Sequence, residues 1–349
     1  MAGARAQATA RYHHVAVTPA GSALTAAWRE AGFAVLECPP LPRFRDVSGA
    51  RRIIDGVATS IAASGAAVVH THGIAGQVFG ARAAQRLNLP VVWHLHDRRE
   101  TRWTFDGLLH RLASRARVDV AVAVSAMVAQ SWRGPVDASR LQVVYNGVSS
   151  QFMLPAPRLD APTVLWCGRL QHWKGTHVFL DLAAAVRRQV PDARFIVVGG
   201  SLFGLEPEYP EALRRQADRL GLSSVIEWVG QVADARPWLA AADVVVHTSV
   251  QPEPFGLVVA EAMMQSRPVV AFRQGGPAEI IVDGHTGALV PPDDVSAMSE
   301  AVVSLLRTPA LRETWGVAGR ARALEKFTVT EMVRRLESAY DRARTGYES

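Results

Sequence analysis

Short runs of β-branched and aliphatic residues alternate with longer amphipathic stretches along most of the chain. In the first half this pattern predicts strands at 14–18, 34–37, 67–70, 91–95, 120–124 and 142–145. It predicts helices between them at 24–31, 51–63, 75–87 and 108–114. Alternation of this kind is typical of βαβ units that build a parallel sheet.

A proline-rich, irregular segment at 152–162 interrupts the alternation, which then restarts. Strands are predicted at 163–167, 194–198, 225–229, 244–247 and 269–272, and helices are predicted to begin near Thr176, Pro207, Ala235, Gly256 and Asp294. We therefore expect an α/β protein with two doubly wound, Rossmann-like parallel-sheet domains, at 1–155 and 156–328. Ligands bind at the carboxyl ends of such strands, so a cleft between the domains is the expected site.

The last segment, 329–349, is predicted to be mainly a helix. Met332, Leu336 and Tyr340 share one face of the stretch 329–344 by their spacing, and the pattern alone leaves open which domain that face covers.

Composition places the chain among globular proteins. Of its 349 residues, 49% are hydrophobic and 20% are charged, and the two cysteines exclude a disulfide scaffold and favour a reducing compartment. The N-terminal segment has no signal-peptide pattern, and no apolar run reaches the roughly 18 residues of a membrane span. We expect a cytoplasmic protein, and a peripheral contact at the inner face of the membrane stays open.

Charge is distributed unevenly. Residues 1–155 carry 17 arginines and 9 acidic residues, a net charge of +8, within a chain of net charge +6. A basic half can meet anionic lipid, an acidic acceptor or nucleic acid, but it is also what a solvated arginine-rich surface looks like, and we prefer the latter. No RNA-binding, zinc-finger or helix-turn-helix motif supports nucleic acid as a partner.

Two common nucleotide-binding motifs are missing. The turn after the first strand, Thr18-Pro-Ala-Gly-Ser22, is no Gly-x-Gly-x-x-Gly fingerprint, which argues against a nicotinamide-dependent enzyme, and the chain has no Walker A sequence. The pair Gly199-Gly200 ends a predicted strand and suits either a close ligand or a simple turn.

The first candidate cluster, Gly168-Arg169-Leu-Gln-His-Trp-Lys174-Gly175, follows the first strand of the second domain. An arginine fork and a lysine point charge in one strand-to-helix turn suit a diphosphate, and the next helix adds backbone donors. The alternative is a pair of solvated surface charges.

The second cluster, Glu253-Pro-Phe-Gly-Leu-Val-Val-Ala-Glu261, brackets the start of a helix. Amides of Phe255, Gly256 and Leu257 would be early helix donors, and a carboxylate can accept from a vicinal diol. Two carboxylates also suit a glycosidase pair, and a helix-capping acid followed by an ordinary helical acid is the plain alternative.

The third cluster consists of histidines at the ends of two neighbouring strands, His70 and His72 on one and His94 and His96 on the next. Four imidazoles suit a metal site. Because only Asp97 accompanies them, we expect no metal and prefer His96 as a polar group facing the cleft, with buried structural histidines as the other alternative.

Together these clusters resemble the retaining nucleotide-sugar glycosyltransferases of the GT-B fold, of the group 1 or family 4 type. The resemblance covers nearly the whole second domain, and its motifs follow in the family's order: Val164-Leu-Trp-Cys-Gly-Arg-Leu…Lys174-Gly, Glu253-(seven residues)-Glu261, Arg267-Pro-Val-Val-Ala, Gly275-Gly-Pro-Ala-Glu279-Ile and Gly284-His-Thr-Gly-Ala-Leu-Val290. Asn146-Gly-Val148 and Val124-Ser125 also fit.

The resemblance implies roles for the charged residues. Arg169 and Lys174, after Gly168, would hold the diphosphate and stabilise the departing charge. Glu253 would contact the hydroxyls of the donor sugar, and Glu261 would bind the ribose diol.

The resemblance also implies roles for a histidine and for residues that contact the donor by their backbone. His96 matches the cleft histidine expected near the donor's anomeric region, and Gly230 and Gln231 would meet the base by backbone. Gly21 would lie on the donor side, but only Ala20 accompanies it where the family has a pair of glycines, which puts that contact in doubt. Ser266 replaces the glycine usual before Arg267.

The implied reaction transfers a hexose from a nucleoside diphosphate sugar, first a UDP-sugar and next a GDP-sugar, with retention of configuration. The acceptor oxygen attacks on the side that the nucleotide leaves, and the leaving phosphate takes the proton. Neither a metal nor a cofactor is implied. A GT-B phosphorylase or epimerase and a non-catalytic partner that binds nucleotide sugar or lipid are the alternatives.

The acceptor is the open question, whether a small molecule, an oligosaccharide or a lipid-linked sugar. The stretch 98–115 mixes arginines with Trp103 and Phe105 and suits a membrane surface, although a helix packed by its apolar side is preferred. The resemblance further implies that the C-terminal helix returns to the first domain.

Overall fold

The computed structural model describes residues 11–40, 47–101, 105–150, 160–201 and 204–348. Contacts divide the chain into two compact units: Met1–Gly147 with Val329–Ser349 form unit 1, and Val148–Thr328 form unit 2. The first boundary expected from the sequence, at 155, thus lies eight residues beyond the division at 147 that the contacts give. Each unit is described by itself.

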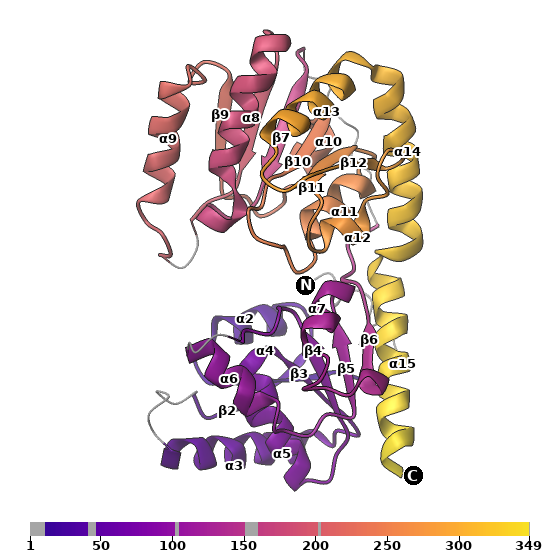
Figure 1. The fold of residues 1–349 in the computed structure, drawn as a ribbon. Coiled ribbons are helices and arrows are strands. Elements are labelled where there is room, and N and C mark those ends of the chain that lie inside the picture. The colour runs from indigo at the N-terminus through magenta and orange to yellow at the C-terminus, as the bar shows by residue number, and fades with distance from the viewer. Residues whose placement is uncertain (1–10, 41–46, 102–104, 151–159, 202–203, 349) are drawn as a thin grey trace. The chain divides into compact units, whose positions relative to one another are not determined.

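Unit 2 is built on one parallel sheet (Figure 1). Its strands are, in spatial order, β12 (Gly287–Val290), β11 (Val269–Phe272), β10 (Val244–His247), β7 (Thr163–Cys167), β8 (Arg194–Val198) and β9 (Ile226–Gly230). The chain runs from β7 outward through β8 and β9, then returns to the other side of β7. This reversal makes the carboxyl end of β7 and β10 the switch point where doubly wound folds bind ligands.

Seven α-helices cover this sheet in the described part of unit 2: α8 (Thr176–Gln189), α9 (Tyr209–Arg219), α10 (Arg236–Ala241), α11 (Leu257–Met264), α12 (Pro277–Ile280), α13 (Val295–Arg307) and α14 (Pro309–Lys326). A short 3₁₀ turn, η4 (His172–Lys174), precedes α8. The core joins sheet residues such as Val164 and Phe195 to Phe179 and Leu180 of α8 and Val302 of α13. The predicted doubly wound parallel sheet is confirmed here, while β12, α12 and α14 were not predicted.

Unit 1 also contains only parallel strand pairs among its described residues, but in two sheets. One consists of β1 (Val15–Pro19) and β2 (Ala34–Cys38), and the other has the order β3 (Val69–His72), β4 (Val91–Leu95), β5 (Val120–Ala123) and β6 (Leu141–Val143). The predicted parallel α/β class is confirmed, although the single sheet implied for this half is divided.

The helices of unit 1 lie between these strands: α2 (Ala23–Glu30), α3 (Val47–Ser64), α4 (Gly73–Ala75), η2 (Gly76–Gly80), α5 (Ala81–Arg86), α6 (Phe105–Ala113), α7 (Ala126–Ser131) and the 3₁₀ turn η3 (Ala138–Arg140). The predicted helix at 75–87 is the run α4–η2–α5, in which η2 is a π-helical turn. The sequence pattern did not predict α7.

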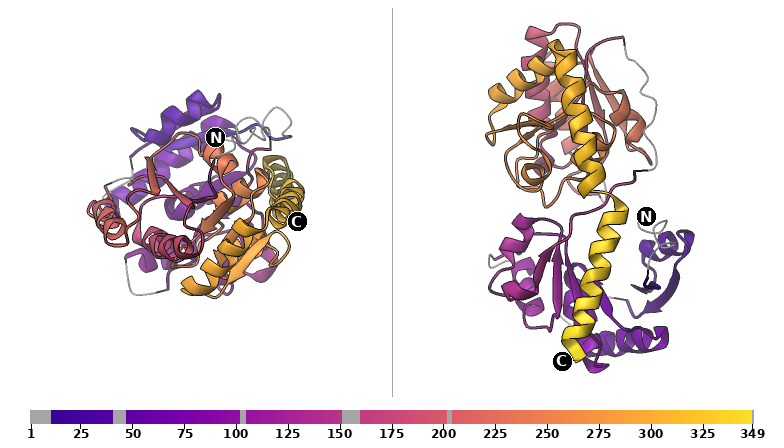
Figure 2. Two further views of the ribbon diagram at one scale, coloured as in Figure 1. Left: turned by 90° about the horizontal axis from the view of Figure 1, so that it is seen from above. Right: turned by 90° about the vertical axis from the view of Figure 1, so that its right-hand side faces the viewer.

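The C-terminal helix α15 (Val329–Glu348) packs on β4 and β5 of unit 1 (Figure 2). Tyr340 is buried there together with Ala339 and Ala343, and Met332 and Leu336 pack against the same core. The apolar face predicted from the spacing is therefore the face that is buried.

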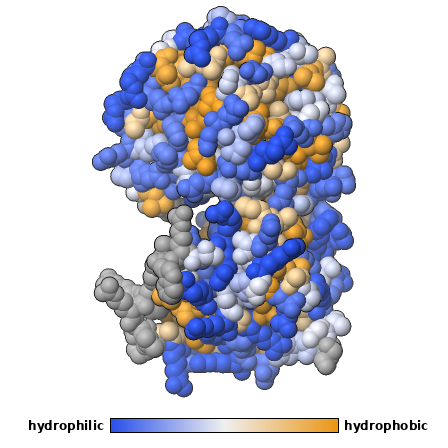
Figure 3. Space-filling view, in the orientation of Figure 1, coloured by the Kyte–Doolittle hydropathy of each residue, from blue (hydrophilic) through white to orange (hydrophobic). Residues whose placement is uncertain are grey.

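Within the described part of the chain, no helix combines the length and hydrophobicity that crossing a membrane requires. On the face shown in Figure 3, hydrophobic residues are scattered among hydrophilic ones. Trp103 of the proposed membrane-facing stretch lies outside the described residues, and the side chain of Phe105 is likewise not described.

Candidate functional site

The loops that follow β7 and β10 interlock at the switch point of unit 2. Gly175 has a φ of 72°, and a Cβ there would overlap the backbone carbonyl of Thr248. The Thr248 hydroxyl donates to the Gly175 carbonyl at 2.8 Å, and the Val250 amide donates to the Trp173 carbonyl at 2.9 Å. Only glycine allows this approach, and the result is a fixed backbone on either side of Lys174.

This backbone brings Lys174 and Glu253 together as an ion pair, although 79 positions separate them in the sequence. Their side chains are only 16% and 12% exposed. His247 Nε2 and the Ser249 hydroxyl each lie 3.4 Å from Glu253 Oε2, and the Lys174 ammonium lies 4.2 Å from the centre of the Trp173 ring. The carboxylate thus sits among donors and the ammonium beside an aromatic face.

The surroundings determine the charge state of the pair. Burial by itself raises the pKa of Glu253, but the hydrogen bond with His247 and the charge of Lys174 outweigh it and lower that pKa to about 2. Burial lowers the pKa of the Lys174 ammonium, and the Glu253 charge opposes that shift. Glu253 is therefore a carboxylate at neutral pH and accepts hydrogen bonds rather than donating a proton.

The loop after β11 fixes the backbone around Glu253. The Gly276 amide donates to the Glu253 carbonyl at 2.8 Å. A Cβ on Gly275 would overlap the backbone of Glu253, and one on Gly276 would overlap the backbone of Phe255. The glycine pair therefore lets two loops lie against each other.

The helix α11 begins directly after this backbone. Gly256 has a φ of 96°, and Leu257 is the first helical residue, so its amide belongs to the first turn of helix donors. Phe255 is buried, with its ring 5.9 Å from that of Phe327, and the Leu257 side chain is exposed. Phe255 thus anchors the turn and Leu257 faces solvent.

The loops after β7, β8 and β9 are joined in the same way. The Gly168 amide donates to the Val198 carbonyl at 3.0 Å, and the Gly199 amide donates to the Gly230 carbonyl at 2.8 Å. A Cβ on Gly199 would overlap the Gly168 carbonyl, so backbone approach accounts for this glycine. Arg169 is exposed beside this loop, with its guanidinium 5.8 Å from the Trp173 ring.

Glu261 lies farther along α11 and is half-buried. Burial raises its pKa, the nearby Asp234 raises it further, and Arg236 opposes both. Arg236 donates to both carboxylate oxygens of Asp234 at 2.8 Å.

Burial, assisted by the charge of Glu261, also raises the pKa of the Cys167 thiol to about 12, which leaves that thiol unreactive as a nucleophile.

The remaining predicted residues of unit 2 lie at the end of β9. Gly230 is the last residue of the strand, with a φ of 80°, and Gln231 follows it on the surface. Gly200 approaches Gln231, since a Cβ on Gly200 would lie 3.2 Å from the Cβ of Gln231. The predicted donor residues from Gly168 to Glu261 therefore all follow strands of one sheet edge or lie on the helix behind it.

Two predicted residues belong to unit 1. Gly21 follows β1 with a φ of 75° and open space around it, so its turn conformation explains the glycine. His96 follows β4, and its Nε2 lies 3.0 Å from Nδ1 of His72. Burial lowers the pKa of His96, and Asp97 opposes this shift.

The structure adds residues that sequence reasoning did not single out. His247 and Ser249 surround the Glu253 carboxylate, and Trp173 lies against Lys174. A signal existed for the first two, because His247 ends a strand that begins with three consecutive valines, and Thr248 and Ser249 follow it.

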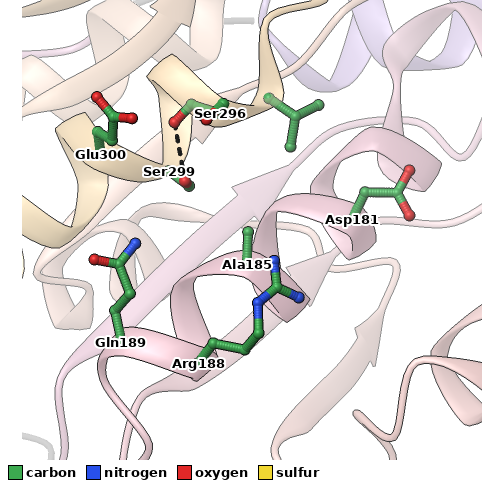
Figure 4. Close-up of a pocket in the computed structure, with 8 residues that line it drawn as sticks. Asp181, Ala185, Arg188, Gln189, Ser296, Ser299 and Glu300 are labelled. Carbon is green, nitrogen blue, oxygen red and sulfur yellow. Dashed lines mark hydrogen bonds between the residues drawn. The ribbon is translucent and has the colours of Figure 1, made fainter.

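The pocket in Figure 4 lies elsewhere on unit 2. It has a volume of about 350 Å³ and lies between α8 and α13, where Asp181, Arg188 and Glu300 are among its lining residues. None of the predicted site residues lines it.

Comparisons with known proteins identify the family. Residues 161–308 match the family model "Glycosyl transferases group 1", and residues 4–152 match "Glycosyltransferase Family 4". The chain is 31% identical over 315 residues to D-inositol 3-phosphate glycosyltransferase of Nocardioides sp., covering 79% of this chain and 67% of that protein. It is 31% identical over 302 residues to alpha-maltose-1-phosphate synthase of Mycolicibacterium smegmatis, covering 76% of each.

Among solved structures, HepE of Anabaena in complex with UDP superposes with a TM-score of 0.81 at 25% identity, covering 93% of this chain and 90% of that one. The family 4 model thus matches mainly the N-terminal segment of unit 1, and the group 1 model matches most of unit 2. The chain therefore belongs to the family 4, group 1 glycosyltransferases of the GT-B fold and is a glycosyltransferase.

Proposed function

We propose that this glycosyltransferase transfers a hexose-type sugar from a nucleoside diphosphate sugar to an acceptor hydroxyl, with retention of configuration and without a metal ion. A UDP-sugar is the first choice of donor and a GDP-sugar the second. The observation that carries the proposal is the Lys174–Glu253 pair at the switch point of unit 2.

The pair offers one group for each half of the donor. An ammonium has three donors, and Glu253 occupies one of those of Lys174. A diphosphate can take the others, with Arg169 exposed on the same loop to add a guanidinium. Negative charge that builds up on the leaving phosphate is then opposed by fixed cations, which is the largest contribution in chemistry of this kind.

Glu253 is the partner proposed for the sugar. With its pKa near 2 it remains a carboxylate and accepts hydrogen bonds from sugar hydroxyls. The amides of Phe255 and Gly256, just before α11, and that of Leu257, its first residue, are proposed as donors next to it. Glu261 is proposed for the ribose diol, and Gly230 with Gln231 for the base.

The same residues support retention by a front-face route. The acceptor oxygen attacks C1 as the bond from C1 to the phosphate oxygen breaks, and the acceptor proton passes to that phosphate oxygen. Near the pair, Cys167 has too high a pKa to act as a nucleophile. From unit 1 we assign His96 a catalytic role near the anomeric carbon and Gly21 a contact on the donor side.

Relatives support the substrate classes. HepE was solved with UDP and also with UDP-glucose, which favours a UDP-sugar donor. The name of the Nocardioides relative contains an inositol phosphate, which favours a small molecule as the acceptor. An oligosaccharide and a lipid-linked sugar are the other proposed acceptor classes. The two free cysteines suit a reducing, cytoplasmic compartment.

A thermal-shift panel with UDP, GDP, ADP and dTDP, in the presence of EDTA, tests the donor site. At 100 times its dissociation constant a nucleotide stabilises the protein by about 2.7 kcal/mol. For a unit of this size each kcal/mol raises the melting temperature by about 2–4 °C, so the expected rise is about 5–11 °C. A rise with one nucleotide identifies the base, and no rise with any of them contradicts the donor site.

A second measurement tests retention. With the donor identified, the anomeric configuration of the product is determined by NMR from the coupling of its H1 proton. The same configuration as in the donor supports the front-face route, and the opposite configuration refutes it.

A further inference from the structure

Four histidines of unit 1, His70, His72, His94 and His96, lie together on one face of the sheet. His70 and His72 alternate along β3, His94 lies on β4, and the strand register sets His72 opposite His94. The rings of His70 and His94 are 5.2 Å apart and those of His94 and His96 are 4.1 Å apart, centre to centre. Residues of equal parity on neighbouring parallel strands share a face, which explains the cluster.

Three of these residues converge on one point. One ring nitrogen from each of His70, His72 and His94 lies within 4.8 Å of those from the other two. Zn²⁺ holds imidazole nitrogens at about 2.0–2.1 Å, which places tetrahedral ligands roughly 3.4 Å apart. Closing such a site therefore brings the nitrogens together by no more than about 1.4 Å from the limit of 4.8 Å.

The hydrogen bonds of the cluster leave nitrogens for a ligand. His94 is buried, and neither of its ring nitrogens has a hydrogen-bond partner among the described residues. The same holds for Nε2 of His70. A buried polar atom without a partner costs free energy, so these three nitrogens need an explanation.

The Nδ1 atoms of His70 and His72 each have a hydrogen-bond partner, as the second nitrogen of a metal-binding histidine usually does. Nδ1 of His70 lies 2.8 Å from the Tyr340 hydroxyl, and Nδ1 of His72 lies 3.0 Å from Nε2 of His96. A ligating imidazole usually bonds through its second nitrogen to a neighbour that fixes the ring. His72 is exposed, which gives an ion a path from solvent.

We propose that His70, His72 and His94 form a three-histidine site for a divalent transition-metal ion such as Zn²⁺, with a fourth position left for water or another ligand. Imidazole ligands favour Zn²⁺ and its neighbours over Mg²⁺ or Ca²⁺. The ion fixes the ring of His72 and, through it, the ring of His96. The site belongs to unit 1 and takes no part in binding the diphosphate.

The test is a calorimetric titration of full-length, tag-free protein, first stripped with EDTA and dialysed, with Zn²⁺. Co²⁺ is added in parallel, because its visible absorption reports coordination geometry. We expect about one equivalent of Zn²⁺ to bind and Co²⁺ to give the bands of a tetrahedral site.

Variants locate the ion. His72→Ala and His94→Leu are each expected to weaken Zn²⁺ binding by at least about tenfold, as the loss of a ligand requires. His285→Ala, at an exposed histidine of unit 2, is the matched control and is expected to leave binding unchanged. Because His72 is exposed, its variant keeps the test decisive even where His94→Leu fails to fold. No saturable binding, or binding that His72→Ala leaves unchanged, overturns the proposal.

Discussion

Glu253→Gln distinguishes the two roles that we propose for the ion pair of Lys174 and Glu253. Glutamine keeps the shape of the side chain and one acceptor oxygen but removes the charge that faces Lys174. If Glu253 contacts the sugar while Lys174 binds the diphosphate, the substitution must reduce turnover without weakening the binding of UDP alone.

The structure sets the size of each effect. The depression of the pKa of Glu253 from 4.5 to about 2 corresponds to roughly 3 kcal/mol of preference for the charged form. Because both side chains keep some solvent contact and glutamine retains a hydrogen bond, we expect a loss of about 1–2 kcal/mol in the free energy of unfolding. Turnover should fall at least about 100-fold, or about 3 kcal/mol in activation free energy.

The binding of UDP should move in the opposite direction. In the proposed binding mode, the negative charge of Glu253 beside Lys174 repels the diphosphate. Without that charge, UDP should bind as tightly as before or up to about tenfold more tightly, a gain of about 1.4 kcal/mol.

UDP affinity is measured by calorimetry, and turnover by UDP release from the donor that the nucleotide panel identifies. Glu211→Gln, on the exposed surface of α9, is the matched control and should match the native protein in both assays. Native turnover in the Glu253→Gln protein refutes the reasoning, and so does a loss of UDP affinity as large as that caused by removing Lys174.

Three further outcomes are expected. Lys174→Ala should weaken UDP binding at least about tenfold by calorimetry, because it removes a charge-assisted bond to the diphosphate, whereas Lys326→Ala, at the other lysine of the chain, should not. The folded-state pKa of Glu253 lies below its ordinary value, so its stabilising contribution is complete above about pH 4.5 and is lost as the pH falls toward 2; urea midpoints between pH 5 and 3 should therefore fall less steeply in Glu253→Gln than in the native protein. Gly175→Ala should lower the melting temperature more than Gly221→Ala, since both glycines have positive φ but only Gly175 lies against a carbonyl; equal losses would contradict the interlocked loops.

Four of the six strands of unit 2 could be predicted with their observed bounds, because they are short, largely buried apolar runs. The predicted bounds 163–167, 194–198, 244–247 and 269–272 are those of β7, β8, β10 and β11. Strands of a covered parallel sheet read as continuous hydrophobic stretches, which makes their ends sharp. The order of the strands in the sheet could not be predicted in this way, because it depends on contacts between residues far apart in the chain.

Helix α14 shows why a local signal can fail. Gly316 and Gly319 lower its helix propensity, yet both are buried against other parts of unit 2. A Cβ on Gly316 would overlap the Ser266 carbonyl, and one on Gly319 would lie 3.4 Å from Met263. The glycines weaken the helix locally and allow it to pack closely on α11, which the sequence pattern does not reveal.

The site shows the same division between local and non-local information. The motifs placed Lys174 after a strand and Glu253 before a helix but did not bring them into contact, because only the order of the sheet makes β7 and β10 neighbours. The sequence pattern identifies His70, His72, His94 and His96 as alternating residues at the ends of two strands. Their convergence depends on the register that sets His72 opposite His94, and this register is a property of the folded sheet.

The glycines and the ion pair have complementary roles at the switch point. Gly175, Gly275 and Gly276 allow backbone segments to touch where a Cβ would collide, so the loops after β7, β10 and β11 support one another. Because this backbone is fixed, Lys174 and Glu253 can move only by rotation of their side chains. In the proposed binding mode, the diphosphate takes the remaining donors of Lys174 and the sugar contacts Glu253 while the loops keep their positions, which keeps the cost of reorganisation at the moment of reaction low.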